Sequence, residues 1–188
     1  MVIKNINNMG TRGKYGFYYN GKYYLFYNHF DSYVDGLGNK ILKELIQLIK
    51  TCILENVNFY EYIKNYINNA KIVTDNDKPT PGDIIKLQYL TDLQVSEESM
   101  DNWYCLTRKG QGSITSHLYT GIFYCEVLGK LPEPDIFIEF TYIIDLEKHV
   151  FYEVNDSMNR VDLDELLKNS DCEISLYKEE SEEELVHR

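Results

Sequence analysis

Two stretches rich in Tyr and Phe each predict a β-hairpin. In the first, residues 13–19 and 22–27 flank Asn20-Gly21, and both arms are dense in aromatic residues, which favour a pleated sheet. Asn-Gly supplies the two positive-φ residues that a type I′ turn needs. We therefore expect a tight hairpin over residues 13–27.

The second hairpin is predicted for residues 136–144 and 150–154, which are joined by the polar turn 145–149. Alternate residues of its first arm share one face, and we expect that face to meet the core: Ile136, Ile138, Phe140 and Tyr142.

Between and after the hairpins, apolar residues recur every three or four positions, which is typical of amphipathic helices. This spacing predicts helices over residues 40–53, 59–69, 80–90 and 113–124, with a short helix over 163–167. Asn39 is expected to cap the first helix, and Thr80-Pro81-Gly82-Asp83 resembles a capping box. Two hairpins separated by about four helices predict the α+β class, with one antiparallel sheet and the helices packed against it.

No repeat or linker divides the 188 residues, a length that fits one domain. We expect a loose leader over residues 1–8, a single α+β domain over residues 9–176, and an acidic tail over residues 177–188, where five glutamates cluster.

Composition narrows the function classes. The net charge is −11, from 30 Asp and Glu against 19 Lys and Arg, which repels phosphate backbones, so we expect no nucleic-acid partner. No run of about 18 apolar residues is present, so no membrane partner is expected. The four cysteines are far apart, without a C-x-x-C pair, and no signal peptide is recognisable. We expect free thiols in a reducing cytoplasm rather than a secreted protein.

The connection after the first hairpin is one candidate site. It contains Asn28, His29, Asp31 and Ser32. An aspartate near a histidine can orient the imidazole for proton transfer, with Ser32 or Thr11 as nucleophile. The same side chains can instead satisfy loop backbone groups, and we favour this interpretation because no second histidine completes a triad. A metal site on His29 and Asp31 would lack the closely spaced His or Cys pair of zinc sites, so no metal is expected.

The glycines of Gly36-Leu37-Gly38 precede a helix and could hold an anion at its start. A third glycine and a βαβ unit are missing, so we interpret both glycines as turn residues and expect no cofactor.

Arg108 and Gln111, close to Trp103, form a candidate ligand-binding site. A planar guanidinium near aromatic rings can hold a carboxylate or a phosphate. Arg108 can equally pair with one of the nearby acids, and the sequence does not choose between the two roles: the acids are Glu97, Glu98 and Asp101.

A set of motifs spans most of residues 9–154. They are Met9-Gly10-Thr11-Arg12-Gly13, Asn28-His29-Phe30-Asp31-Ser32-Tyr33, Gly36-Leu37-Gly38, Trp103-Tyr104-Cys105-Leu106-Thr107-Arg108, Gln111-Gly112 and Phe140-Thr141-Tyr142-Ile143-Ile144-Asp145. Together they resemble an uncharacterised family from large DNA viruses of the marseillevirus and mimivirus kind, from fungi and, more distantly, from bacteria and phages. The resemblance implies a viral origin and packaging in the virion, with no established activity.

A second, weaker similarity involves Thr11, the hairpin that follows it, and Asn28-x-x-Asp31. This order is similar to the opening of N-terminal nucleophile hydrolases, in which an exposed N-terminal Cys, Ser or Thr is both nucleophile and base. The similarity implies Thr11 as nucleophile, with Asn28 and Asp31 positioning the substrate. It requires removal of residues 1–10.

We predict a non-catalytic binding or assembly protein that is a homodimer in the host cytoplasm and in the virion, with a host or virion protein as further partner. The 17 tyrosines favour this prediction because tyrosine is enriched at interfaces. The alternatives are an amidohydrolase that uses Thr11, and an acidic mimic that binds a basic host protein.

Overall fold

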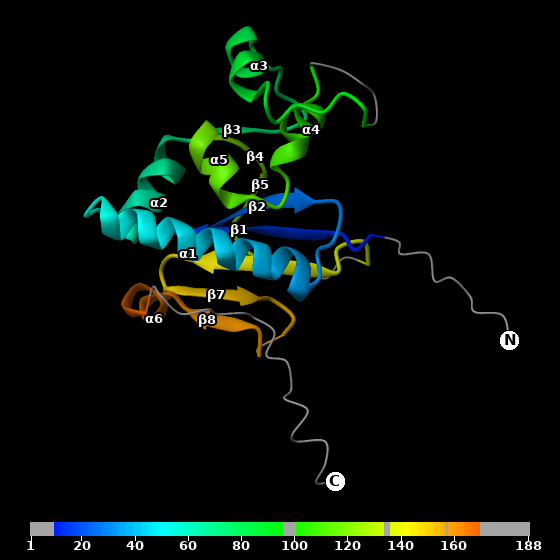
Figure 1. Ribbon diagram of the computed structural model, residues 1–188. Coiled ribbons are helices and arrows are strands. Elements are labelled where there is room, and N and C mark those ends of the chain that lie inside the picture. The colour runs from blue at the N-terminus through cyan, green and yellow to red at the C-terminus, as the bar shows by residue number, and fades with distance from the viewer. Residues whose placement is uncertain (1–9, 96–100, 134–135, 157, 170–188) are drawn as a thin grey trace, which may run out of the picture.

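The protein has an α+β fold, as the sequence predicts, built on a mostly antiparallel six-stranded sheet (Figure 1). The computed structural model describes residues 10–95, 101–133, 136–156 and 158–169. The expected leader over residues 1–8 and the expected acidic tail over residues 177–188 lie outside these ranges.

The first predicted hairpin is confirmed. Strands β1 (Gly13–Tyr19) and β2 (Lys22–Asn28) pair in antiparallel register from Gly13 with Asn28 to Tyr19 with Lys22. The turn residues Asn20 and Gly21 have φ values of 51° and 69°, as a type I′ turn requires.

The second predicted hairpin forms between β6 (Phe140–Asp145) and β7 (Val150–Glu153). Its first arm starts later than expected, and the expectation that Ile136 meets the core is wrong, because its side chain is 88% exposed. β6 also pairs with β1 in parallel, so the two hairpins form one sheet in the order β5-β2-β1-β6-β7-β8. The edge strands are β5 (Glu126–Leu128) and β8 (Arg160–Asp162).

Helices α1 (Asn39–Leu54), α2 (Phe59–Asn69) and α6 (Leu163–Lys168) confirm three predicted helices. In Figure 1, α1 lies across one face of the sheet. The larger core joins this face to α1, α2, α6 and a further helix, α5 (Ile114–Thr120). It contains Tyr15, Phe17, Phe26, Leu42, Leu45, Tyr142 and Phe151. One turn of π-helix, Val34–Gly38, runs directly into α1, so Asn39 is the first helical residue and the expected Asn39 cap is wrong.

A smaller group of elements lies above the β2 side of the sheet in Figure 1 and has its own core. It contains β3 (Lys71–Val73), α3 (Pro81–Leu87), α4 (Trp103–Thr107) and β4 (Ile122–Tyr124). The predicted capping box at the start of α3 is confirmed, since the side chains of Thr80 and Asp83 each accept the other's backbone N–H.

The predicted helix over residues 113–124 is too long. Its helical part, α5 (Ile114–Thr120), ends at Gly121, which has a φ of 60°. Residues 122–124 form β4, which pairs in parallel with β3. A left-handed glycine is a common end of a helix, and here it redirects the chain into a strand.

Candidate functional site

Several residues that the sequence singles out converge on one pocket of about 400 Å³, which we call the polar pocket. Its lining includes Asn28, Asp31, Lys40, Arg108, Gln111 and Gly112. They come from the connection after β2, the first turn of α1 and the turn after α4. Two cations, Lys40 and Arg108, face one carboxylate, Asp31, so the lining is positive in a chain whose net charge is −11.

Hydrogen bonds centred on Ser32 hold the connection after β2. Nδ2 of Asn28 donates to Oγ of Ser32 over 2.9 Å and to the carbonyl of Phe30. The N–H of Ser32 donates to the Thr11 hydroxyl over 2.8 Å, and the Tyr142 hydroxyl donates to the Ser32 carbonyl over 2.9 Å. Ser32 is fully buried, so these bonds give its polar groups the partners they need.

Two glycines let backbone segments approach closely beside this loop. A Cβ atom at Gly36 would lie 2.4 Å from the carbonyl oxygen of Asp31, and one at Gly13 would lie 2.6 Å from Cβ of Ser32. Asp31 has a φ of 53°, in the left-handed region that few non-glycine residues adopt. The path of the loop therefore depends on the absence of a side chain at both glycines.

The guanidinium group of Arg108 lies against two aromatic rings. Its Cζ is 5.2 Å from the ring centroid of Phe30 and 5.4 Å from that of Tyr104. It also donates a hydrogen bond to Oε1 of Gln111. None of the ion pairs between described residues involves Arg108, and residues 97 and 98, two of the acids considered as its partners, lie outside the described ranges.

His29 connects the end of β2 to the Arg108 turn. Its backbone N–H donates to Oε1 of Gln111 over 3.2 Å, and its ring nitrogen Nδ1 lies 2.9 Å from the Tyr27 hydroxyl. Burial lowers the pKa of His29, and the charges of Arg108 and Arg12 lower it further. Burial and these cations disfavour a protonated imidazole at this position.

Tyr15 anchors the turn 108–112 to the sheet. Gly112 donates its N–H to the Tyr15 hydroxyl over 2.8 Å and has a φ of 75°. A Cβ atom at Gly112 would lie 3.2 Å from Nζ of Lys40. Glycine at this position therefore supplies the backbone conformation of the turn and leaves room for the lysine.

Trp103 and Thr11, like His29, are sequence candidates that do not line the polar pocket. Trp103 is buried in the smaller core, where its indole N–H donates to the carbonyl of Asp77 over 3.0 Å. Tyr104, not Trp103, supplies the ring beside Arg108. Thr11 lines neither pocket described in this section, and its hydroxyl oxygen accepts the Ser32 N–H.

The hydrogen bonds of His29 join it to Tyr27 and to Gln111. His29 directs its Nδ1 to Tyr27, and no hydrogen bond within the described ranges joins it to Asp31 or Thr11. In the part of the chain that the structure describes, no three His, Cys, Asp or Glu side chains are grouped to hold a metal ion. What the pocket offers is a planar cation, an ammonium group and amide groups around a small volume.

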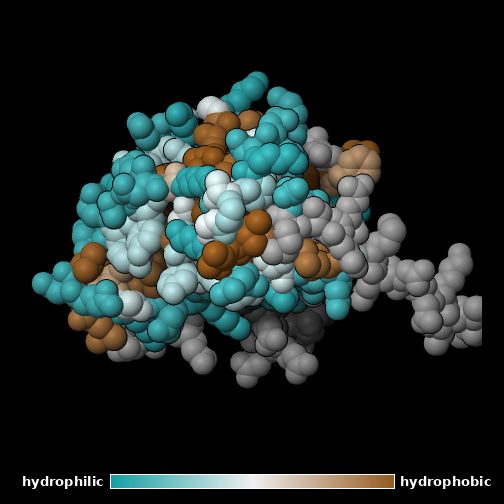
Figure 2. Space-filling view, turned by 90° about the horizontal axis from the view of Figure 1, so that it is seen from above, coloured by the Kyte–Doolittle hydropathy of each residue, from teal (hydrophilic) through white to brown (hydrophobic). Residues whose placement is uncertain are grey.

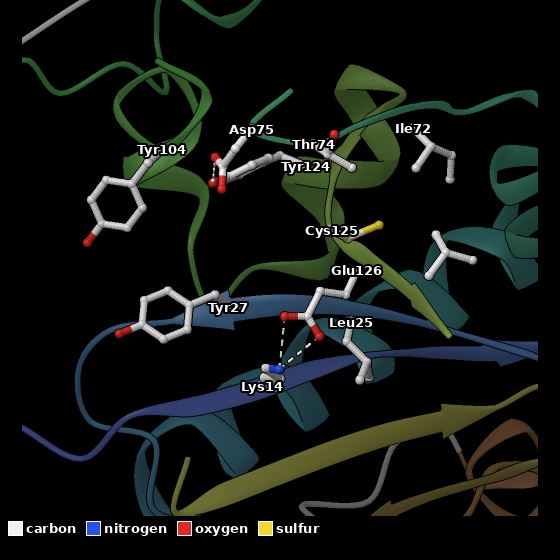
Figure 3. Close-up of a pocket in the computed structure, with 11 residues that line it drawn as sticks. Lys14, Leu25, Tyr27, Ile72, Thr74, Asp75, Tyr104, Tyr124, Cys125 and Glu126 are labelled. Carbon is white, nitrogen blue, oxygen red and sulfur yellow. Dashed lines mark hydrogen bonds and ion pairs between the residues drawn. The ribbon is translucent and has the colours of Figure 1, made fainter. Parts of the chain in front are cut away.

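A second pocket, of about 490 Å³, borders the other face of β2 and is drawn in Figure 3; we call it the tyrosine pocket. Its lining includes Lys14, Tyr27, Asp75, Tyr104, Tyr124 and Glu126. Successive strand residues point to opposite faces, so Tyr27 faces this pocket while Asn28 faces the polar pocket. Tyr104 and Arg108 are one helical turn apart, and the first lines the tyrosine pocket while the second lines the polar pocket.

Sequence reasoning missed most of the tyrosine pocket and part of the polar pocket. Lys40 lies on the polar side of a predicted helix, as many lysines do, so its position in the sequence does not mark it as a binding residue. Tyr124 belongs to β4, which the sequence assigns to a helix. One signal could have found the tyrosine pocket: the alternation in β1 and β2 places Lys14 and Tyr27 on the face away from the larger core.

No helix within the described ranges is both long enough and apolar enough to cross a membrane. Searches against protein-family models, curated proteins and solved structures find no match to this chain.

Proposed function

We propose that the chain is a non-catalytic binding protein whose polar pocket takes the carboxylate or phosphate group of a small ligand. One observation carries this proposal: the Arg108 guanidinium lies against the rings of Phe30 and Tyr104 at the edge of a pocket that it lines. Arginine held in one orientation presents two parallel N–H groups to an anion, which gives strong, charge-assisted hydrogen bonds.

Lys40 supplies a second cation to the same pocket. Its Nζ donates to the carbonyl of Gln111 over 3.4 Å, and it lines the same pocket as Arg108. The pocket volume of about 400 Å³ falls in the range of small-molecule sites, about 300–1,000 Å³.

Titration calorimetry with inorganic phosphate and with acetate, at low ionic strength, tests the proposal. Arg108→Gln is expected to weaken binding by about tenfold or more, since a hydrogen bond to a charged group contributes about 1.5–3 kcal/mol. Lys109→Gln is the matched control, because it removes the same charge from an exposed neighbouring side chain that is not part of the lining.

Two results would contradict the proposal. One is that the unaltered protein binds neither anion. The other is that Arg108→Gln and Lys109→Gln bind phosphate equally well.

We also propose that the chain forms a homodimer. Exposed apolar side chains at the end of α1 support this: Ile53, Leu54 and Val57, of which Leu54 is 86% exposed. The face in Figure 2, seen from above Figure 1, has apolar atoms in separate patches, so it offers no continuous apolar surface. Sedimentation at tens of micromolar should show a dimer that Leu54→Glu dissociates, and a monomeric unaltered protein would refute it.

The proposed viral origin, the virion and host-cytoplasm locations, and a host or virion protein partner rest on the motif pattern of residues 9–38 and 103–145. Mass spectrometry of purified particles checks the virion location, and absence of the chain from them would contradict it. The amidohydrolase alternative predicts a mature chain that begins at Thr11, which intact-mass measurement checks.

A further inference from the structure

The rings of three tyrosines line the tyrosine pocket. In Figure 3, Tyr27 and Tyr104 lie on one side, with Tyr124 across the top and Leu25 and Cys125 on the other side. The centroids of Tyr27 and Tyr104 are 6.5 Å apart, with a tilt of 40° between the rings. All three tyrosines are only partly buried, and Tyr124 also packs against the smaller core.

The two carboxylates of this pocket differ in their partners. Glu126 forms an ion pair with Lys14, with 2.8 Å between Oε2 and Nζ, which is drawn in Figure 3. Asp75 accepts the hydroxyl hydrogen of Tyr124 over 2.6 Å. No ion pair between described residues involves Asp75. The lining therefore has one negative charge that no described cation balances, at the Tyr124 end of the pocket.

The Tyr124 hydroxyl is the donor of its hydrogen bond to Asp75. Burial and the Asp75 carboxylate raise the pKa of Tyr124, so its hydroxyl stays protonated and continues to donate. The Tyr124 ring is consequently held beside the Asp75 carboxylate, at one end of the pocket.

The face of an aromatic ring attracts cations, and sets of tyrosine rings recognise quaternary ammonium groups. Arg108 occupies one face of Tyr104, which leaves that ring's other face and the rings of Tyr27 and Tyr124 for a ligand. We propose that the tyrosine pocket binds a small organic cation, with its charged group beside Asp75 and Tyr124 and an apolar body against Leu25. An anion would meet the unbalanced carboxylate, and a neutral ligand would leave it without a counterion.

This proposal goes beyond the anion site and does not rest on it. The two pockets share no lining residue, and their charges are opposite in sign. Each pocket can therefore fail its test without affecting the other.

Choline and its neutral carbon isostere, in which carbon replaces the ammonium nitrogen, are suitable probes because they have the same shape. Calorimetry on the full chain is expected to show choline binding that is about tenfold tighter than that of the isostere, since a desolvated cation–π contact contributes up to about 2 kcal/mol. No binding of choline at tens of millimolar, or equal binding of the two probes, would overturn the proposal.

Two pairs of variants locate the site. Asp75→Asn is expected to weaken choline binding by about tenfold. Glu61→Gln makes the same charge change on an exposed side chain of α2, outside the pocket, and should leave choline binding unchanged. Tyr27→Leu should weaken binding, and Tyr27→Phe should retain it, because only the first removes the ring. Choline binding that is insensitive to both Asp75→Asn and Tyr27→Leu would overturn the assignment to this pocket.

Lys40→Gln separates the two sites. It removes a cation from the polar pocket alone, so phosphate binding should weaken while choline binding stays the same. Loss of choline binding in this variant would contradict the proposed independence of the two pockets.

Discussion

The hydroxyl of Tyr15 lies 2.7 Å from Nε2 of His117 inside the larger core. Both side chains are buried, and the His117 ring stacks on Phe26 with 3.8 Å between the centroids. The same hydroxyl accepts the N–H of Gly112. One polar contact in the core thus connects β1, α5 and the turn that carries the polar pocket.

Tyr15→Phe is expected to lower the free energy of unfolding by about 1–3 kcal/mol, because the Gly112 N–H and His117 lose a buried partner. Phosphate binding should weaken as well, since the turn 108–112 loses its anchor. Urea unfolding and calorimetry measure the two effects. Tyr18→Phe is the control on the same strand, because no hydrogen bond of its hydroxyl is found within the described ranges, and an equal loss in both variants would contradict the assigned role of Tyr15.

His117 makes stability depend on pH. Burial lowers its pKa to about 3, whereas the pKa of the imidazole in the unfolded chain is about 6.5. Between these values the unfolded chain binds a proton that the folded chain does not. The contribution of His117 to stability therefore falls as the pH decreases through this interval, by up to about 1.4 kcal/mol per pH unit, and is constant above it.

Unfolding by urea is measured over a pH series for the unaltered protein and for His117→Gln. All other ionisable groups are common to both proteins, so the difference between the two pH profiles isolates the contribution of His117. The variant should lose less stability than the unaltered protein between pH values of about 6.5 and about 4. Parallel pH profiles would show that His117 is not the responsible group.

Signals between close neighbours in the sequence predicted much of the fold. The Asn20-Gly21 turn and the box of Thr80 and Asp83 depend on residues within a few positions of each other. The parallel pair of β1 and β6 was not predicted, because it joins Gly13 to Phe140 and no local pattern encodes such a distant partner. Strand β4 was also missed, since its apolar residues continue the helical spacing of α5.

The candidate site was predictable in part. The sequence indicates Asn28 and Asp31 as catalytic candidates and Arg108 and Gln111 as ligand-binding candidates, and these four residues line one pocket. The sequence analysis places Trp103 beside Arg108, whereas the ring that contacts Arg108 belongs to Tyr104. Residues four apart on a helix share a face, and Tyr104 is the aromatic residue four positions before Arg108. Lys40 was missed because only the packing of α1 against the turn 108–112 brings it to the pocket.

Gly36→Ala is expected to destabilise the protein by about 1–3 kcal/mol, because the new methyl group would lie 2.4 Å from the Asp31 carbonyl oxygen. Gly82→Ala is the matched control: its nearest neighbour would be Oγ1 of Thr80 at 3.7 Å, which is ordinary contact. Alanine also favours a helix over glycine, so this control should be neutral or slightly stabilising. Thermal unfolding followed by circular dichroism compares the two, and equal melting temperatures would contradict the close approach at Gly36.

Cys125 is expected to react slowly although it lines the tyrosine pocket. Burial raises the pKa of its thiol to about 12, and only 8% of its surface is exposed. At a pH of about 8 the reactive thiolate is then on the order of one part in ten thousand of the residue. Iodoacetamide should modify Cys125 far more slowly in the folded protein than in urea, as peptide mass spectrometry can measure.

Choline should not accelerate the reaction of Cys125 with iodoacetamide, because a ligand in the tyrosine pocket covers the thiol further. Modification at the same rate in both states would show that the wall of the tyrosine pocket opens freely, and a cation site that depends on fixed rings would then be untenable.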